Sequence, residues 1–376
     1  MIERTNDSLY GIAAEKTTFG GKVVFIGLSA HNSHGGIQRF NRRVIAALNH
    51  LSVAAASIML LDQSPGLSGG VNAAFYGSGG NRKTFLAQAI RLGIQADKML
   101  LGHINLLPVA IVLKLLRPSL RIYLFAHGVE VWGDPGFRRP RRWESTVIRK
   151  MITKVAIVSN FSRSRMMVAF QLPLEKFVIF PNAVDDGESI PVVSKRSNIL
   201  CVSRLAESER DKNIDKILRA LPAVIRQCPN ARLQIVGQGG LASELRKLAS
   251  ELGVERSVDF FGAVSDADLQ SAYHAASVFA LPSSKEGFGI VYLEAWKAGI
   301  PVIGSVFGAS SETISDGIDG FTVDPSDIDL LARRLITLLT DDQLACRMAK
   351  AGLDKVREKY SMQAFVANLS KIVHGP

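Results

Sequence analysis

Two glutamates flank a glycine-rich turn in the second half of the chain. The segment Pro282–Ala295 follows the apolar run Val278–Leu281 and reads PSSKEGFGIVYLEA. Glycines between a strand and a helix leave backbone N–H groups accessible at the helix start, where the helix dipole favours a phosphate group. Glu286 precedes the expected helix and Glu294 lies two turns inside it, which at about 1.5 Å per residue separates them by about 12 Å.

This separation discriminates between two uses of a carboxylate pair. The two carboxylates of a glycoside hydrolase lie roughly 5–9.5 Å apart, so about 12 Å is too far for that chemistry. The spacing is comparable to the span from a sugar ring, across a diphosphate, to a ribose. We therefore expect one extended ligand, although Glu294 could instead be an ordinary exposed helix residue. The residues expected to face the diphosphate are Gly287, Phe288, Gly289 and Ile290.

The same segment resembles a known motif. Glu286 and Glu294, with Gly-Phe-Gly after the first and AGIPV at residues 298–302, are similar to the donor-site motif of retaining glycosyltransferases with the GT-B fold, in particular family 4. The resemblance extends over nearly the whole chain from Lys22. It implies that Glu286 contacts hydroxyls of a donor sugar and that Glu294 holds the ribose of the nucleotide.

Two cations of the second half match the same family. Arg204 and Lys212 resemble the Arg and Lys that clamp the donor diphosphate, and two cations opposite a helix N-terminus suit two phosphate charges. The stretch between them, AESERD, is longer and more charged than is usual in the family, so Arg210 is an alternative second cation. We favour Lys212 because it opens the expected helix from Asn213. An exposed, salt-bridged surface is the other interpretation.

The first half contributes further matches. Gly35 and Gly36 resemble the glycine loop that faces the diphosphate, and His127, at the end of an expected strand, matches a histidine beside the donor sugar. Taken alone, a Gly-Gly turn or a single histidine is more often structural. Other family landmarks are Asn160, Pro181 and Asn182, which we expect to shape loops of the cleft, and the second-domain carboxylate Glu312. The preceding Gly308-Ala309 departs from the two glycines often found there.

A competing pattern occurs near the middle of the chain. The sequence IVGQGGLA at 235–242 fits G-x-G-x-x-A between a strand and a helix, with Asp259 further on, which is the pattern of a nicotinamide dinucleotide site. Alone it is a weak signal, and it lies in the second series of strands rather than the first. The family resemblance also expects a glycine turn here, so we place Gly237 in the donor site, with Val264 as a contact to the base.

We expect neither a metal nor a cofactor. The seven histidines show no HxxxH or HExxH spacing, and no Asp-x-Asp suited to a phosphate-bound Mg²⁺ is present, because Asp327-x-Asp329 fits a helix start better. The three cysteines have no paired spacing. The charge of a leaving diphosphate would then fall to Arg204, Lys212 and backbone N–H groups. No enzyme nucleophile is evident, which favours front-face attack with the leaving phosphate taking the acceptor proton.

The elements around these residues predict two α/β domains. A chain of 376 residues exceeds what one core usually holds. Short apolar runs alternate with helical patterns, which indicates parallel sheets covered on both faces, and the alternation restarts near residue 195. We expect two Rossmann-like doubly wound domains facing a cleft: residues 1–185, with an extension before Lys22, and the donor-binding residues 186–359. A C-terminal helix, 360–376, is expected to pack back on the first domain.

The expected strands fall into two series of six. The first is Lys22–Leu28, Val53–Leu61, Met99–Leu101, Arg121–Ala126, Lys154–Ser159 and Phe177–Phe180. The second is Ser197–Val202, Ala231–Val236, Ser257–Phe261, Val278–Leu281, Pro301–Gly304 and Gly320–Val323. The helical patterns between them include Gln38–Asn49, Lys212–Cys228, Leu241–Leu252, Ser265–Ala275, Val291–Ala298 and Asp327–Thr340.

The formal charge of +11 lies entirely in the first half. Residues 1–190 hold 23 Lys and Arg against 12 Asp and Glu, whereas residues 191–376 hold 22 of each. The densest basic run is Arg138, Arg139, Arg141, Arg142, Arg149, Lys150 and Lys154. This run is either a solvated face or a surface that attracts anionic lipid or a phosphorylated acceptor. No recognition motif accompanies it, so we do not expect nucleic acid as a partner.

No run of apolar residues reaches the length needed to span a bilayer, and Ile104–Leu116 is better interpreted as a buried helix. The polar N-terminus does not resemble a signal peptide. We therefore expect a cytoplasmic protein with peripheral contact to the inner, anionic face of the membrane.

The expected function is retaining transfer of a hexose from a GDP- or UDP-linked sugar to a glycan or polyprenyl-diphosphate-linked acceptor. The sequence does not identify the base or the sugar. The alternatives are a nucleotide-sugar epimerase on the same fold, an NAD(P)-dependent oxidoreductase, and a binding module without turnover.

Overall fold

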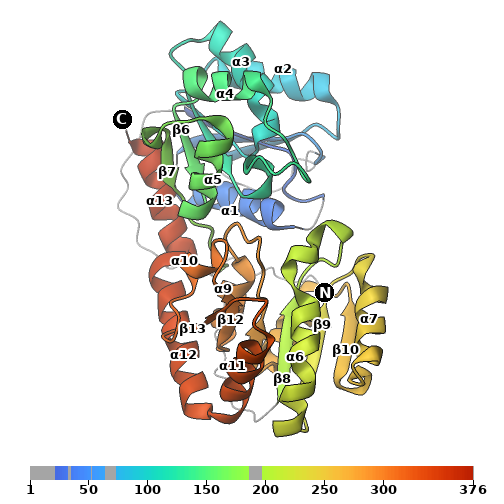
Figure 1. Ribbon diagram of the computed structural model, residues 1–376. Helices are drawn as coiled ribbons and strands as arrows, with labels where there is room; N and C mark the ends of the chain where they lie inside the picture. The colour runs from blue at the N-terminus through green and yellow to red at the C-terminus, as the bar shows by residue number, and fades with distance from the viewer. Residues whose placement is uncertain (1–21, 33–34, 52, 64–72, 186–196, 376) are drawn as a thin grey trace, which may run out of the picture.

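The computed structural model describes residues 22–375 except 33–34, 52, 64–72 and 186–196 (Figure 1). The expected extension before Lys22 and most of the segment between the two expected series of strands lie outside these ranges. The described chain forms two α/β units, each with one parallel sheet, and all twelve predicted strands form within two residues of their expected bounds. The predicted pair of doubly wound domains is confirmed.

The first sheet has seven parallel strands in the order β3-β2-β1-β4-β5-β6-β7. The strand order reverses between β1 and β4, and the loops after these two strands diverge there to leave a crevice at the carboxyl ends. The strands are β1 Lys22–Gly27, β2 Ala54–Met59, β3 Ala73–Gly77, β4 Lys98–Leu101, β5 Arg121–Ala126, β6 Lys154–Ile157 and β7 Phe177–Ile179. Its helices are α1 Gly36–His50, α2 Arg82–Gly93, α3 Leu107–Leu116, α4 Arg142–Met151 and α5 Asn160–Phe170, with 3₁₀ turns η1 Ile104–Leu106, η2 Val129–Val131 and η3 Leu174–Lys176.

The second sheet has six parallel strands in the order β10-β9-β8-β11-β12-β13, with its switch point between β8 and β11. The strands are β8 Asn198–Val202, β9 Arg232–Val236, β10 Val258–Gly262, β11 Val278–Ala280, β12 Val302–Ser305 and β13 Gly320–Val323. Its helices are α6 Ile214–Gln227, α7 Leu241–Glu251, α8 Asp266–Ala275, α9 Ile290–Lys297, α10 Ser310–Thr313, α11 Ile328–Thr340 and α12 Asp342–Lys355. The 3₁₀ turns η4 Glu207–Lys212 and η5 Glu255–Ser257 and the π turn η6 Val356–Tyr360 complete it.

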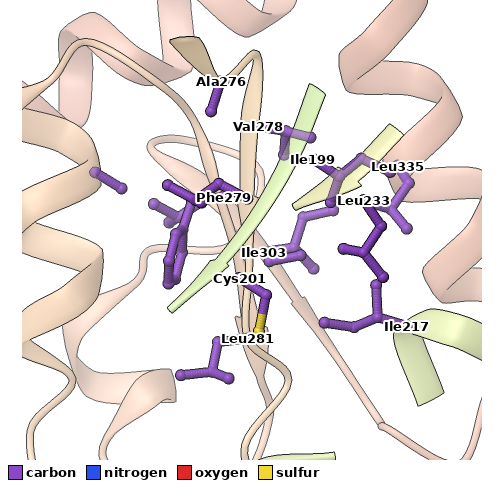
Figure 2. Close-up of a cluster of buried hydrophobic side chains, with 14 of the residues drawn as sticks. Ile199, Cys201, Ile217, Leu233, Ala276, Val278, Phe279, Leu281, Ile303 and Leu335 are labelled. Atoms are coloured by element: carbon purple, nitrogen blue, oxygen red, sulfur yellow. The ribbon is translucent and has the colours of Figure 1, made fainter. Parts of the chain in front are cut away.

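Both faces of each sheet are buried. In β1, Val24 and Ile26 belong to one apolar cluster and Val23 and Phe25 to another, as the two-residue period of a strand requires. In the second domain the strands and helices share one cluster, and Figure 2 shows Phe279 of β11 among side chains from neighbouring strands and helices. Burial on both faces explains why the strands are unbroken apolar runs in the sequence.

One strand is missing from the sequence interpretation. β3 pairs in parallel with β2 at the edge of the first sheet, with Ala55 opposite Ala73 and Met59 opposite Gly77. Its sequence, AAFYG, is short, ends in glycine and lies between Gly- and Ser-containing segments. An edge strand is covered less than a central one, so its apolar signal is weaker.

The C-terminal helix returns to the first domain. Helix α13, Met362–His374, is the red helix near the C-terminus that lies beside the first domain in Figure 1, and it contacts α1. The Phe365 ring packs edge-on against Phe40 and Phe180, with ring centroids 5.5 and 4.9 Å away. Lys98, whose side chain is buried at the start of β4, donates to the Ile372 carbonyl at 3.2 Å. These contacts join the end of the chain to the first sheet.

Within the ranges that the structure describes, no helix is both long enough and apolar enough to cross a membrane.

Replacing Phe365 with alanine tests how far α13 stabilises the first domain. Phe365 is 1% exposed. Its truncation leaves a cavity in the aromatic cluster, and we expect a loss of about 3–5 kcal/mol in the free energy of unfolding. Urea denaturation of Phe365→Ala and wild type would measure it. The control is Val168→Ala, at a site 81% exposed, where we expect about 0.5 kcal/mol or less. Equal losses in both variants would contradict the packing role of α13.

Candidate functional site

The glycine turn after β11 is set by the start of α9. Gly289 has a left-handed backbone, with φ of 85°, and a Cβ there would lie 2.4 Å from the Tyr292 ring. The hydroxyl of Thr313 donates to the Phe288 carbonyl at 2.9 Å and holds the turn. Helix α9 begins only at Ile290, so the helical rise used for the estimate of about 12 Å between the two glutamates does not apply to residues 286–289.

Glu286 forms an ion pair with Lys212. The Lys212 Nζ lies 2.8 Å from Glu286 Oε2 and 3.9 Å from Glu209 Oε2, and both the Lys212 and Glu286 side chains are less than one-fifth exposed. Burial alone would lower the pKa of Lys212, but the Glu286 and Glu209 carboxylates outweigh it and hold that pKa above its ordinary value. Lys212 is therefore a fixed positive charge beside the glycine turn.

The local structure around Lys212 differs from the expected helix start. Lys212 ends the 3₁₀ turn η4, and the left-handed Asn213, with φ of 57°, separates it from α6. The Asn213 side chain donates to the Pro282 carbonyl and the Ser284 hydroxyl, both at 2.8 Å. A polar side chain that bonds outside the helix favours this break and ties η4 to the segment that carries Glu286.

Arg210, the alternative cation, lies on another surface. Its guanidinium binds the Glu244 carboxylate at 2.7 and 2.8 Å and Glu207 at 2.8 Å, and all three side chains are exposed. The structure thus places Lys212, and not Arg210, against Glu286.

Arg204 lies on a segment that rests on the glycine turn 237–240. A Cβ at Gly237 would lie 1.8 Å from the Ser203 carbonyl oxygen, so the two backbones approach closely only with glycine there. Leu205 N donates to the Gln238 carbonyl and Leu241 N to the Leu205 carbonyl, both at 2.9 Å. The Arg204 side chain is 82% exposed and pairs with Glu209.

These bonds account for the G-x-G-x-x-A pattern without a dinucleotide. The first N–H of α7, at Leu241, is already bonded to the Leu205 carbonyl, where a pyrophosphate would need it free. The acid that would hold a ribose, Asp259, forms an ion pair with Arg232 of the neighbouring strand β9. The turn therefore supports the Arg204 segment. Val264 lies just after β10 and is partly buried against the apolar cluster of the second domain.

His127 follows β5 and is held by a carboxylate that the sequence interpretation missed. The buried Glu130 Oε1 accepts from the backbone N–H groups of His127, at 2.5 Å, and Gly128, at 3.1 Å. The His127 Nε2 lies 3.0 Å from the Gly102 carbonyl, and its ring packs edge-on against Phe40 at 4.6 Å. Beside it, burial is the main cause that lowers the pKa of His103 to about 4.

The loop before Gly35 and Gly36 is also organised by a carboxylate. Asp62, 1% exposed, accepts hydrogen bonds from the Ser29 hydroxyl and from three successive backbone N–H groups, at 2.7–3.1 Å. Burial raises the pKa of Asp62, but these bonds outweigh it and the net pKa is below its usual value. Gly36 begins α1 and is exposed together with Gly35. In the sequence, Asp62 directly follows the apolar run Val53–Leu61, and this position could have indicated its role.

Glu294 contacts both domains. Its Oε1 accepts from Arg39 of α1 at 2.5 Å, and its Oε2 accepts from the Tyr273 hydroxyl at 2.9 Å. A second Arg39 nitrogen lies 3.3 Å from Asp266. Burial raises the pKa of Glu294, and Arg39 and Tyr273 offset only part of the effect. Neither Arg39 nor Tyr273 was expected from the sequence.

The remaining contacts close the cleft on the side of His127. The Ser159 and Ser162 hydroxyls donate to the Gly287 carbonyl at 2.7 and 3.2 Å. Glu312 accepts from Asn160 N at 2.8 Å and from Phe161 N, so it caps α5 across the cleft. In this structure Glu312 thus joins the two domains.

Two further charge contacts flank these. Lys285 links Asp134 of the first domain, at 2.8 Å, to Asp211 of the second, at 2.9 Å. Asn182 is another position matched to the family. Its side-chain oxygen accepts from Arg43 at 3.2 Å and from the backbone N–H of Ala183.

The site has the character of a charged cleft. Among the residues that the structure describes, no cluster of three His, Cys, Asp or Glu could hold a metal ion, and the three cysteines are free. A cavity of about 260 Å³ lies between α1, α8 and α9, lined in part by Arg39, Tyr273 and Glu294.

Comparison with known proteins gives a family and a fold. Residues 184–355 match the family model of glycosyl transferases group 1. The chain is 32% identical over 279 residues to a GDP-mannose-dependent monoacylated alpha-(1-6)-phosphatidylinositol monomannoside mannosyltransferase of Corynebacterium glutamicum, a match that covers 67% of this chain and 70% of the relative.

A related mannosyltransferase of Mycolicibacterium smegmatis, named GDP-mannose-dependent alpha-(1-6)-phosphatidylinositol monomannoside mannosyltransferase, is 32% identical over 240 residues. That match covers 59% of this chain and 62% of the relative, so it spans less than two thirds of the relative's length.

Two solved structures share the GT-B fold of this chain. HepE of Anabaena in complex with UDP has a TM-score of 0.74 at 18% identity and covers 94% of this chain and 100% of its own. Sucrose-phosphate synthase of Thermosynechococcus elongatus has a TM-score of 0.72 at 18% identity, with 94% and 98% covered.

The closed arrangement depends on a glycine at position 287. A Cβ there would lie 2.8 Å from the His127 carbonyl oxygen and 3.2 Å from Gly128 Cα. We expect Gly287→Ala to push the domains apart and to cost about 1–3 kcal/mol in the free energy of unfolding, as overpacking does. Small-angle scattering should show a larger radius of gyration. In the control, Gly36→Ala, the added Cβ meets no atom within 4 Å. An unchanged radius for Gly287→Ala would show that the contact does not control closure.

Proposed function

Since the chain belongs to the glycosyl transferases group 1, we propose that it moves a hexose from a nucleotide-diphosphate sugar to an acceptor hydroxyl, with retention of the anomeric configuration. The observation that carries the proposal is the largely buried Lys212–Glu286 pair at the glycine turn before α9, which lies against the His127 turn. It brings a cation, a carboxylate and a helix N-terminus to one side of the cleft, as a sugar diphosphate requires. The GDP-mannose-dependent relatives make GDP-mannose the first donor to test, with UDP-sugars second.

In the proposed reaction the bond between the sugar C1 and the β-phosphate oxygen breaks, and a bond from C1 to the acceptor oxygen forms on the same face. The acceptor proton passes to the leaving phosphate oxygen. Lys212, Arg204 and the first N–H groups of α9 stabilise the charge of the departing nucleoside diphosphate, without a metal. Glu286 orients the sugar through its hydroxyls, and His127 lies on the other side of the ring. Closure of the two domains excludes water, which would hydrolyse the donor.

Glu286 is the residue to remove first. We expect Glu286→Ala to lower turnover by about 10²–10³-fold, because the sugar loses the group that fixes its hydroxyls while the phosphate contacts remain. The assay is transfer from radiolabelled GDP-mannose and UDP-glucose, with EDTA, to phosphatidylinositol monomannoside or a polyprenyl-diphosphate-linked sugar. The control is Glu255→Ala, at an exposed carboxylate of the second domain. Near wild-type turnover by a folded Glu286→Ala protein would refute the assignment.

The acceptor is proposed to be membrane-linked, and we propose that one surface of the first domain meets the membrane. The basic residues fall into two groups, one at each end of α4. This helix runs from the cleft end of the first sheet to the opposite end. Phe137 and Trp143 are 59% and 38% exposed and accompany the exposed Arg139 and Arg141 on the cleft side. Basic side chains interleaved with aromatic ones suit an anionic lipid interface.

The rest of the basic run lies at the other end of α4. Arg149 and Lys150 lie near the start of β6, about 10–15 Å further from the cleft, as the length of α4 requires. A lipid surface bound there would be remote from the glycine turn. The cleft-side residues are therefore the proposed docking surface.

Two matched double variants test this surface. In about 0.1 M salt the Debye length is about 10 Å, so only nearby charges act on a lipid surface. We expect Arg139→Gln/Arg141→Gln to weaken binding to vesicles of phosphatidylglycerol and phosphatidylcholine roughly 30-fold, which corresponds to about 1 kcal/mol per charge. Arg149→Gln/Lys150→Gln removes the same charge at the far end and should change binding little. Equal losses in the two variants, or binding that is insensitive to salt, would count against the proposal.

A further inference from the structure

We propose that Arg39, which belongs to the first domain, is a positioning residue that holds Glu294 ready for the ribose of the donor when the cleft is closed. The inference rests on the proposed role of Glu294 toward the ribose. It gives the first domain a part, acting through Glu294, in recognition of the nucleotide, beyond its proposed part in the sugar and acceptor sites.

The geometry places Arg39 at the junction of three elements. It lies in the first turn of α1, three residues after Gly36, and its side chain is 27% exposed. One guanidinium nitrogen donates to Glu294 of α9 at 2.5 Å, and the other lies 3.3 Å from Asp266, the first residue of α8. Arg39 therefore extends from the loop that faces the diphosphate to the carboxylate that faces the ribose.

The Arg39–Glu294 pair leaves room for a ligand on the same carboxylate. Oε1 accepts from Arg39 and Oε2 from the Tyr273 hydroxyl at 2.9 Å. An ionised carboxylate has about four acceptor sites, two on each oxygen, so one on each remains for the two hydroxyls of a ribose. Arg39 and Tyr273 thus fix the orientation of both oxygens before the nucleotide arrives.

The Glu294 carboxylate needs a cationic partner to stay ionised. Burial raises the pKa of Glu294, and the nearby Asp185 raises it further, whereas Arg39, Tyr273 and Arg43 oppose the rise. Without Arg39 the carboxyl group would take a proton more readily and accept fewer hydrogen bonds from hydroxyls. Arg39 therefore supports the ionised form, which accepts ribose hydroxyls most strongly.

The cavity beside the pair is bounded by both domains. Arg39 lines it from the first domain, and Asp266, Tyr273 and Glu294 line it from the second. A nucleoside at this place would be contacted from two sides at once. The alternative is that Arg39 only joins the domains and does not take part in nucleotide recognition.

The experiment separates recognition of the ribose from closure of the domains. Calorimetric titration of the full chain, in EDTA, would use GDP, UDP and their 2′,3′-dideoxy analogues. We expect wild type to bind the ribonucleotide at least about 10-fold more tightly than its dideoxy analogue, because two hydroxyls bond to a charged group. In Arg39→Met the dissociation constant for the ribonucleotide should rise about 10-fold, and that for the dideoxy analogue less than about twofold.

Control variants make each outcome decisive. Arg82→Met carries the same change at an exposed position of α2 and should bind like wild type. If Arg39→Met weakens the ribonucleotide and the dideoxy analogue equally, or weakens neither, the inference is overturned. If Glu294→Gln loses the preference for ribose while Arg39→Met keeps it, the inference about Arg39 is overturned and the proposed role of Glu294 stands. If wild type binds neither GDP nor UDP, the proposed function itself fails.

Discussion

The two domains meet through peptide backbone, and the rest of the site depends on that contact. Gly287 has no side chain, so its Cα can approach the turn of His127 and Gly128, and its carbonyl accepts from Ser159 and Ser162. The turn on the other side is equally constrained, because Glu130 binds both of its N–H groups. The sides proposed to bind the sugar and the phosphates therefore have one relative position when the cleft is closed, which is the preorganisation that transfer chemistry needs.

Carboxylates organise this cleft more than its cations do. Asp62 gathers the loop before α1, Glu130 holds the His127 turn, and Glu312 caps α5 from the opposite domain. In each case an ionised oxygen accepts from backbone N–H groups, which makes stronger bonds than a neutral acceptor would. Such bonds leave the loops rigid without filling the cleft. The cations Arg204 and Lys212 can then face a ligand whose own charge is negative.

The sequence predicted what depends on local pattern. Twelve of the thirteen described strands, including the edge strands β7, β10 and β13, appeared as apolar runs, whereas the edge strand β3 was hidden by its short, glycine-ended sequence. Lys212 was placed in a helix because the left-handed break at Asn213 depends on bonds to Pro282 and Ser284, 69 and 71 residues away. The Arg39–Glu294 pair joins positions 255 residues apart. Within α1, Arg39 resembles one charge of a solvated helix face, and only the fold brings it to its partner.

The closed arrangement must also open, and the nature of its contacts permits this. The Ser159 and Ser162 bonds to Gly287 join neutral groups, and each contributes only about 0.5–1.5 kcal/mol net. The Lys285–Asp134 pair is partly exposed, so solvent weakens it. The Lys212–Glu286 pair lies within one domain and is kept on opening, whereas Arg39–Glu294 and the Glu312 bonds to the start of α5 cross the cleft and are lost. A nucleoside diphosphate bound as proposed would add contacts to both sides at once and so favour closure, and its departure would return the domains to a balance that a few kcal/mol decides.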